Sequence, residues 1–278
     1  MILKMDRKKI AEIIVDQLKT NKKNIELLVN NSINEVGYFY LDDLLPEDFA
    51  IKLFNVFPET KDMFLRKNIR EYKYVGIQMN KYNSLIEETI YAFQDLRVVE
   101  YIAKIFNLKN IYPDPKLYAG GISVMKENNF LNPHIDNSHN EGRKKWRVLN
   151  LLYYVTPDWK EEYGGNLEIW NKGMNSKQIT IESKFNRLVV MLTHNHSWHS
   201  VSPVNHIVNR CCISNYYFSD FSTNSNANFH VTSFRARPGN KLKDLVLKFD
   251  TYLRMIIRNF FKHGIKKEFH IYKDNKKF

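Results

Sequence analysis

The chain has 278 residues, of which 44% are hydrophobic and 26% are charged. This length and composition indicate one folded domain with helical additions, and they exclude a disordered protein. No apolar run approaches the roughly 20 residues that span a bilayer, and the N-terminus lacks the long apolar core of a signal peptide, so we expect a cytoplasmic protein. The two cysteines, Cys211 and Cys212, are adjacent and poorly placed for a disulfide or a zinc site, which fits a reducing compartment.

The formal net charge of +12 is concentrated near the C-terminus. Residues 234–278 contain 13 Lys or Arg against four acidic residues, so the part of the chain before them is nearly neutral. The sequence has no glycine-rich phosphate loop, no RNP-like aromatic strand and no cysteine cluster. We therefore expect no nucleic-acid partner.

The first hundred residues are predicted to be mainly helical with a few strands. Apolar residues recur at helical spacing in three segments, and Pro46 suits the first turn of the second one. Two further segments are rich in aromatic and β-branched residues, as strands are. The predicted elements are helices over residues 7–30, 46–54 and 83–106, and strands over residues 36–41 and 72–77.

From Leu117 onward, short apolar runs alternate with turn residues at a spacing of roughly ten residues. About eight such runs predict an antiparallel sandwich or barrel, and we expect a jelly roll, also called a double-stranded β-helix. The fold class is therefore mainly β, with helices packed at both ends of the chain. The predicted strands cover residues 117–125, the His134 segment, 148–155, 166–170, 178–181, 187–192, the His199 segment and 211–218.

The C-terminal part is predicted to be a basic amphipathic helix that starts after Asn240, a good N-cap residue. We favour a helix that buttresses the jelly roll through its apolar stripe, with the basic face in solvent. A weak contact with an anionic surface is the alternative, and the stripe is also long enough to form a dimer, which leaves the oligomeric state open. The stripe consists of Leu242, Leu245, Val246, Phe249, Leu253, Ile256, Ile257 and Phe260.

Three predicted parts follow from this pattern. Residues 1–35 form an N-terminal helical extension, residues 36–225 form the jelly-roll domain, and residues 226–278 form a C-terminal helical extension.

Two short segments of the jelly roll carry the residues that suit metal chemistry. His134 and Asp136 are two residues apart, so on an extended strand their side chains point the same way. His199 follows 63 residues after Asp136, and Arg210 comes 11 residues later. Two histidines and one carboxylate on one face of a metal form the facial triad of non-heme Fe(II) oxygenases. Either half alone is also compatible with structural histidines.

A second metal arrangement competes with this triad. His194, His196 and His199 lie close together in the sequence, and such a cluster suggests zinc. We favour the interpretation in which His194 and His196 border the mouth of the site.

With these residues, the sequence resembles the Fe(II)- and 2-oxoglutarate-dependent oxygenases, in particular the prolyl-4-hydroxylase-like branch. The resemblance extends from about Val36 to Phe221. Its motifs come in the order and approximate spacing that the branch shows. They are residues 134–137, residues 147–155, Asp158-Trp159, Gly164-Gly165, and the stretch from His199 to Arg210.

The resemblance implies a role for each matching residue. His134, Asp136 and His199 would bind Fe(II), and Arg210 would pair with the far carboxylate of 2-oxoglutarate. The cosubstrates would be 2-oxoglutarate and O2. Tyr154 matches a family tyrosine whose hydroxyl reaches the same carboxylate, and Asn150, on the same face of the strand, is a weaker candidate. Tyr153 is the alternative to Tyr154, since the strand register decides which of the two faces inward.

The resemblance also implies a dioxygenase that oxidises a C–H bond while 2-oxoglutarate is converted to succinate and carbon dioxide. Asp136 favours hydroxylation, because halogenating relatives carry a small residue at that position. We favour a small molecule or biosynthetic intermediate as substrate over a peptidyl proline, and Arg147 and residues 137–146 are candidates to meet a polar or anionic substrate. The alternative of a different class is a non-catalytic metal-binding jelly roll that acts as a sensor or interaction module.

Overall fold

The computed structural model describes residues 5–224, 227–261 and 271–272. The helices in these ranges are α1 (Arg7–Thr20), α2 (Lys22–Ser32), α3 (Glu47–Asn55), α4 (Ser84–Ala92), α5 (Leu96–Ile105) and α6 (Lys241–Phe260). The strands are β1 (Tyr38–Leu41), β2 (Phe64–Lys67), β3 (Glu71–Gly76), β4 (Ile111–Tyr112), β5 (Gly121–Met125), β6 (Phe130–Ile135), β7 (Trp146–Tyr154), β8 (Leu167–Ile169), β9 (Ile179–Ile181), β10 (Arg187–Leu192), β11 (His199–Val201), β12 (Arg210–Ser219) and β13 (Ser233–Phe234).

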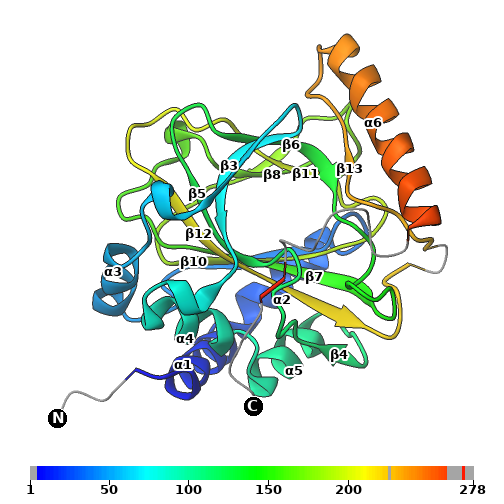
Figure 1. Ribbon diagram of the computed structural model, residues 1–278. Coiled ribbons are helices and arrows are strands. Elements are labelled where there is room, and N and C mark those ends of the chain that lie inside the picture. Colours follow the sequence, from blue (N-terminus) through cyan, green and yellow to red (C-terminus); the bar gives the residue numbers. More distant parts are fainter. Residues whose placement is uncertain (1–4, 225–226, 262–270, 273–278) are drawn as a thin grey trace.

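The strands form one antiparallel sheet that curls on itself. Its main path runs β1-β10-β7-β12-β5-β3-β6-β11-β8-β9. In Figure 1, β6, β8 and β11 lie above and β7, β10 and β12 lie below, and β3 and β5 connect the two layers. This arrangement confirms the predicted jelly roll with helices at both ends of the chain.

The N-terminal helices cover the outer face of the lower layer (Figure 1). The stripe Ile10, Ile14 and Leu18 of α1 is fully buried, in the same core cluster as Tyr153 of β7. Because side chains alternate along a strand, this packing directs Tyr153 to the helices and Tyr154 into the barrel. Both faces of β7 are buried. The outer face packs against the helices, and the inner face lines the barrel interior, where it can hold polar groups.

Two of the predicted helices are each divided in the structure. Residues 7–30 form α1 and α2, which meet at Asn21, and residues 83–106 form α4 and α5. Asp95 starts α5, since its side chain accepts a hydrogen bond from the backbone N–H of Arg97. The strand β2, which pairs with β3 as a hairpin, was not predicted.

The orientation of α6 contradicts the prediction that its apolar stripe packs on the barrel. Asn240 caps the helix as expected, but Leu247 is its only buried residue, and Leu242 and Phe260 are 81% and 80% exposed. The helix is instead attached through its polar side, where Asp244 binds Arg235 and Asp250 binds Arg70. Ion pairs, hydrogen bonds and one leucine therefore hold α6 beside β13, and the apolar stripe faces outward.

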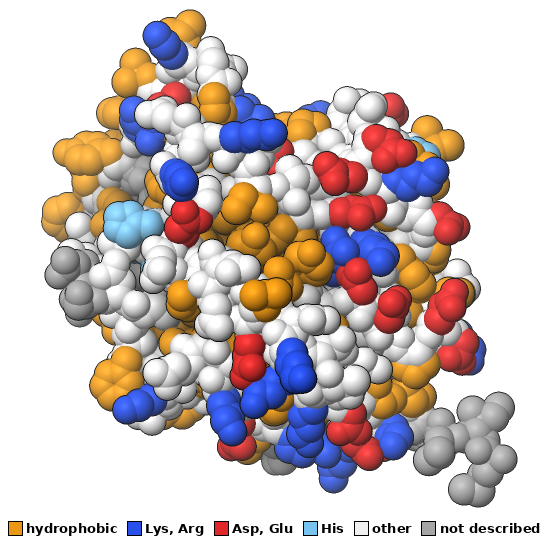
Figure 2. All heavy atoms as spheres, turned by 180° about the vertical axis from the view of Figure 1, so that it is seen from behind, with side chains coloured by type: hydrophobic (Ala, Val, Ile, Leu, Met, Phe, Trp, Pro, Cys, Tyr) orange, Lys and Arg blue, Asp and Glu red, His pale blue; other side chains and the backbone are white. Residues whose placement is uncertain are grey.

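Figure 2 shows hydrophobic and basic side chains together on the protruding part of the molecule that contains α6. In the described ranges, no helix is long and apolar enough to cross a membrane. The residues of the basic tail beyond 261 lie outside the described residues, apart from 271–272.

Candidate metal centre and its cavity

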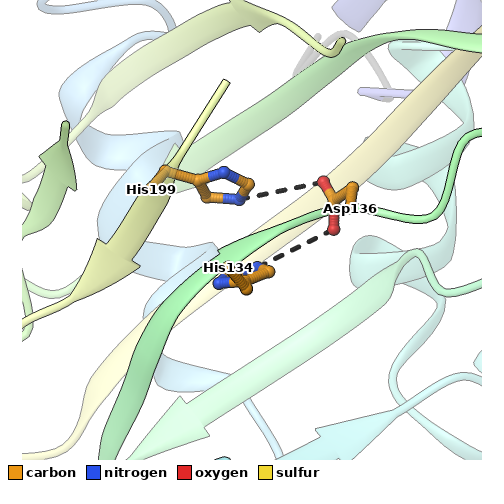
Figure 3. Close-up of side chains that lie close together, drawn as sticks. All are labelled: His134, Asp136 and His199. Atoms are coloured by element: carbon orange, nitrogen blue, oxygen red, sulfur yellow. Dashed lines mark ion pairs between the residues drawn. The ribbon is translucent and has the colours of Figure 1, made fainter. Parts of the chain in front are cut away.

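Two neighbouring strands bring the predicted triad together. His134 lies on β6, Asp136 directly follows this strand, and His199 begins β11, where it is the cross-strand partner of His134. Nε2 of each histidine lies 3.8 Å from a different carboxylate oxygen of Asp136 (Figure 3). One ligand atom from each residue lies within 4.8 Å of the others, which is close enough for all three to bind one metal ion.

Hydrogen bonds orient both imidazole rings. Nδ1 of His134 lies 3.0 Å from the carbonyl oxygen of Asn132, and Nδ1 of His199 lies 2.9 Å from that of Ser197. A carbonyl oxygen can only accept, so each Nδ1 carries the proton and donates it. Each Nε2 is then left with its lone pair directed toward Asp136, which is the tautomer that a metal ligand needs.

The surroundings also set the charges of the triad. Burial, assisted by the neighbouring His199, lowers the pKa of His134 to about 3. Burial alone raises the pKa of Asp136, but His199, Arg147 and His134 together lower it below its ordinary value. His134 is therefore neutral and Asp136 ionised at neutral pH, as metal binding requires.

The donor set fits Fe(II). Two imidazole nitrogens and one carboxylate oxygen converge, and within the described residues Oδ2 of Asp136 is buried without a hydrogen-bond partner. A buried carboxylate oxygen without a partner is costly, and a bound cation would remove that cost. Among the residues that the structure describes, this is the only group of three or more His, Cys, Asp or Glu that could hold a metal. His194 and His196 are not part of it, which disfavours the zinc cluster.

A cavity of about 290 Å³ opens beside the triad and contains the other predicted site residues, Arg210, Tyr154 and Asn150. Arg210 is only 4% exposed, and its Nε and Nη1 have no oxygen or nitrogen acceptor in the described part of the chain. Its guanidinium carbon lies 5.3 Å from the centre of the Tyr154 ring. Such a buried, unsatisfied cation suits a ligand with a carboxylate.

The register resolves the choice between the two tyrosines. Tyr154 pairs with Cys212 and lines the cavity. Tyr153 points to the helices, where its hydroxyl donates to Oδ1 of Asn186 at 2.6 Å. Burial raises the pKa of Tyr154, so its hydroxyl stays protonated and can donate a hydrogen bond.

Among the cavity residues that sequence reasoning did not find are Arg66 of β2, and Glu71 and Lys73 of β3. Glu71 and Lys73 lie two residues apart on one strand, so their side chains share a face, and Arg66 is the cross-strand partner of Lys73. This alternation of charges is visible in the sequence. It gives no sign, however, that the hairpin inserts into the barrel between β5 and β6.

Comparisons with known proteins agree with this geometry. Residues 120–218 match the family model described as the 2OG-Fe(II) oxygenase superfamily. A prolyl-4-hydroxylase from Pseudomonas putida is 15% identical, with 70% of this chain and 98% of that chain covered and a TM-score of 0.53. Prolyl 4-hydroxylases from Phytophthora capsici give 15% identity, 91% and 80% coverage, and a TM-score of 0.51.

No protein of curated function matches the sequence. At this level of identity the solved structures support the fold, and the family model covers the stretch that holds the triad and Arg210. Residues 120–218, and with them the triad and Arg210, thus match the 2OG-Fe(II) oxygenase superfamily in sequence.

Proposed function

We propose that the protein is a hydroxylase of a small molecule or biosynthetic intermediate, with Fe(II) bound by His134, Asp136 and His199. One observation carries this proposal. The three ligand atoms converge inside a buried cavity whose wall also holds Arg210, a cation with two unsatisfied nitrogens. A metal-binding module without chemistry needs no buried guanidinium beside its metal, and this disfavours the sensor alternative.

The residues of the cavity divide the work. When bound, Fe(II) and 2-oxoglutarate supply the oxidising chemistry, in which 2-oxoglutarate becomes succinate and carbon dioxide. Arg210 would hold the far carboxylate of 2-oxoglutarate through its unpaired N–H groups, and the Tyr154 hydroxyl would donate to the same group. Asn150 offers a further polar contact on the same face of β7. The buried walls exclude water, which strengthens each of these electrostatic contacts.

The size of the cavity favours a small substrate. Its volume of about 290 Å³ is at the lower end of the range for small-molecule sites, and 2-oxoglutarate shares it. Side chains from β2, β3 and α6 also line the cavity. These three elements therefore reduce the space around the triad. A peptidyl proline that projects into the cavity from a protein is the alternative substrate.

The first test is succinate formation from 2-oxoglutarate by anaerobically Fe(II)-loaded protein after exposure to air. Wild type is compared with His199→Ala and Arg210→Ala, first with a metabolite library and then with proline peptides. We expect turnover by wild type with a small molecule and its loss in both variants. Stimulation by proline peptides alone would favour the alternative substrate. Failure of wild type to bind Fe(II) and 2-oxoglutarate would refute the proposal.

A second proposal concerns α6, which we infer makes a weak contact with an anionic lipid surface. Its apolar stripe is exposed, and Lys241 and Lys248, the latter paired with Asp244, border one edge of this stripe next to Leu245. Exposed hydrocarbon bordered by lysines is the pattern of helices that lie in a membrane interface, because the apolar residues enter the acyl boundary while the lysines meet lipid phosphates.

This proposal is tested by sedimentation with vesicles of phosphatidylcholine, with and without phosphatidylserine. We expect binding only to the anionic vesicles, weaker at high salt, and lost in Phe249→Glu. Leu27→Glu, which changes an equally exposed apolar residue on α2, is the matched control and is expected to bind as wild type does. A stable dimer that Phe249→Glu separates, without vesicle binding, would assign the stripe to a second copy of the chain instead.

A further inference from the structure

We propose that the substrate carries an anionic oxygen group, a carboxylate or a phosphate, which binds to cations that the β2–β3 hairpin directs into the cavity. This inference rests on the proposed hydroxylase function and specifies the class of its substrate. Arg66 and Lys73 of the hairpin, together with Arg147 of β7, are the residues that we assign to the anion.

The first argument is the charge of the whole cavity. The side chains that line it include six cations, which are Arg66, Arg70, Lys73, Arg147, Arg210 and Arg254. Three carboxylates face them: Glu71 and Asp136 in the lining, and Asp250, which binds both Arg70 and Arg254. The dication Fe(II) and the dianion 2-oxoglutarate cancel each other's charge. The loaded cavity therefore keeps an excess of positive side chains, which favours an anionic substrate.

The second argument is the cluster on the hairpin. Nζ of Lys73 lies 3.1 Å and Nη1 of Arg66 lies 3.7 Å from the two carboxylate oxygens of Glu71. Burial raises the pKa of Glu71, but Lys73 and Arg66 lower it more, so the carboxylate is ionised. One carboxylate thus serves two cations in a mostly buried position. Two cations beside one carboxylate make this wall of the cavity electropositive, which favours an anion there.

The third argument is Arg147, which lies beside the triad. It is 3% exposed, and its guanidinium packs 3.9 Å from the centre of the Tyr216 ring. Its Nη1 lies 3.6 Å from Oδ1 of Asp136, which is beyond hydrogen-bond distance. Once Asp136 binds a metal ion, that carboxylate no longer balances Arg147. Asp114 also attracts Arg147, and a substrate anion near the metal would be the second counterion, in place of Asp136.

A competing explanation is that Lys73 serves 2-oxoglutarate. Tyr74, Val124 and Cys211 form one row across the sheet, and Lys73 and Arg210, each one residue earlier in its own strand, fall together in the next row. However, 2-oxoglutarate has one far carboxylate, and the two unsatisfied nitrogens of Arg210 are enough to bind it. The experiment must therefore measure cosubstrate and anion separately.

The test uses full-length protein loaded with Ni(II) and 2-oxoglutarate, which binds ligands without turnover. Calorimetry measures the affinity for phenyl phosphate and phenylacetate, with benzyl alcohol as a neutral probe. The affinity for 2-oxoglutarate is measured separately on Ni(II)-loaded protein. The variants are Lys73→Met, which removes a cation, and Glu71→Gln, which releases both cations. Lys67→Met makes the same charge change on the exposed side of the same hairpin and is the control.

We expect at least one anion to bind more tightly than benzyl alcohol, and the stronger of the two anions identifies phosphate or carboxylate as the group. Lys73→Met should weaken this anion about tenfold, and Glu71→Gln should strengthen it about threefold to tenfold. Lys67→Met should have no effect. These opposite signs distinguish a binding role from loss of folding, since a misfolded variant would not gain affinity.

Two results would overturn the inference. Either the anions bind no better than benzyl alcohol, or Lys73→Met weakens 2-oxoglutarate and leaves the anions unchanged. In both cases normal binding of Ni(II) and 2-oxoglutarate by wild type would leave the proposed oxygenase function intact. Loss of that binding in wild type would instead refute the function itself.

Discussion

The barrel interior and helix α6 distribute polar and apolar groups in opposite ways. The interior buries Asp136, Arg147 and Arg210, whereas α6 exposes Leu242 and Phe260. Soluble proteins usually bury apolar groups and expose charges, so both regions depart from the rule. A buried charge without a partner and an exposed apolar stripe each cost free energy in the isolated chain. Under the two proposals, ligands would offset this cost in the cavity and a lipid surface would offset it at α6.

The largest predicted effect comes from the triad. We expect His199→Ala to reduce succinate formation and Fe(II) affinity by more than about 100-fold, because removing a direct ligand costs more than removing one of its supporting partners. Fe(II) titration and a succinate assay measure the two effects. His196→Ala, an exposed histidine in the preceding turn, should behave as wild type does. Equal losses in both variants would contradict the assignment of the triad as the metal ligands.

The next effect concerns the cosubstrate. Arg210→Lys is expected to raise the KM for 2-oxoglutarate by about tenfold, since a lysine offers a point charge in place of a planar guanidinium with several N–H donors. Fe(II) affinity should not change. Arg187→Met provides the control, because Arg187 binds Asp42 away from the cavity and should affect stability alone. An unchanged KM in Arg210→Lys would mean that the buried guanidinium has another role.

Two leucines of α6 test the difference between its buried side and its exposed stripe. Leu247→Ala should destabilise the attachment of the helix by about 2–4 kcal/mol, because Leu247 is fully buried. Leu245→Ala, in the exposed stripe, should change stability by less than about 0.5 kcal/mol. Hydrogen exchange of the α6 amides measures local detachment, and urea unfolding measures global stability. Similar losses for the two leucines would show that the stripe is covered in solution.

Asp114 tests whether a buried charge must be functional. Burial raises the pKa of Asp114 to about 6, and attraction by Arg147 offsets this only in part. Between roughly pH 4 and pH 6 the folded state holds more protons than the unfolded state, so stability falls as the pH rises. Asp114→Asn should remove this slope and increase stability at pH 7 by about 1–3 kcal/mol. Urea unfolding at several pH values measures both, and a destabilised variant at pH 7 would contradict the sign.

The smallest effect compares the adjacent tyrosines of β7. Tyr154→Phe should raise the KM for 2-oxoglutarate a few-fold and leave stability nearly unchanged. Tyr153→Phe loses the hydrogen bond to Asn186, so it should cost about 1 kcal/mol of stability without affecting KM. Kinetics and unfolding of the two variants together check the strand register. The opposite pattern would mean that Tyr153 faces the cavity.

Local sequence patterns were sufficient for the strands and the triad. The alternation of apolar runs and turns predicted the jelly roll, and the two-residue spacing of His134 and Asp136 placed them on one side of a strand. Asn240 was recognised as a cap because capping depends on the residue and its immediate neighbours. These features depend on interactions over a few residues, and such interactions can be predicted from the local sequence.

Three features were decided by tertiary structure alone. The register of β7 against β12 turned Tyr154 rather than Tyr153 into the cavity, and insertion of the β2–β3 hairpin brought Lys73 to its wall. Ion pairs of Asp244 and Asp250 turned the apolar stripe of α6 outward, although its periodicity predicted the opposite. Periodicity determines that a helix or strand has an apolar face. Which face meets the barrel depends on contacts between residues far apart in the sequence, so it is established only when the chain folds.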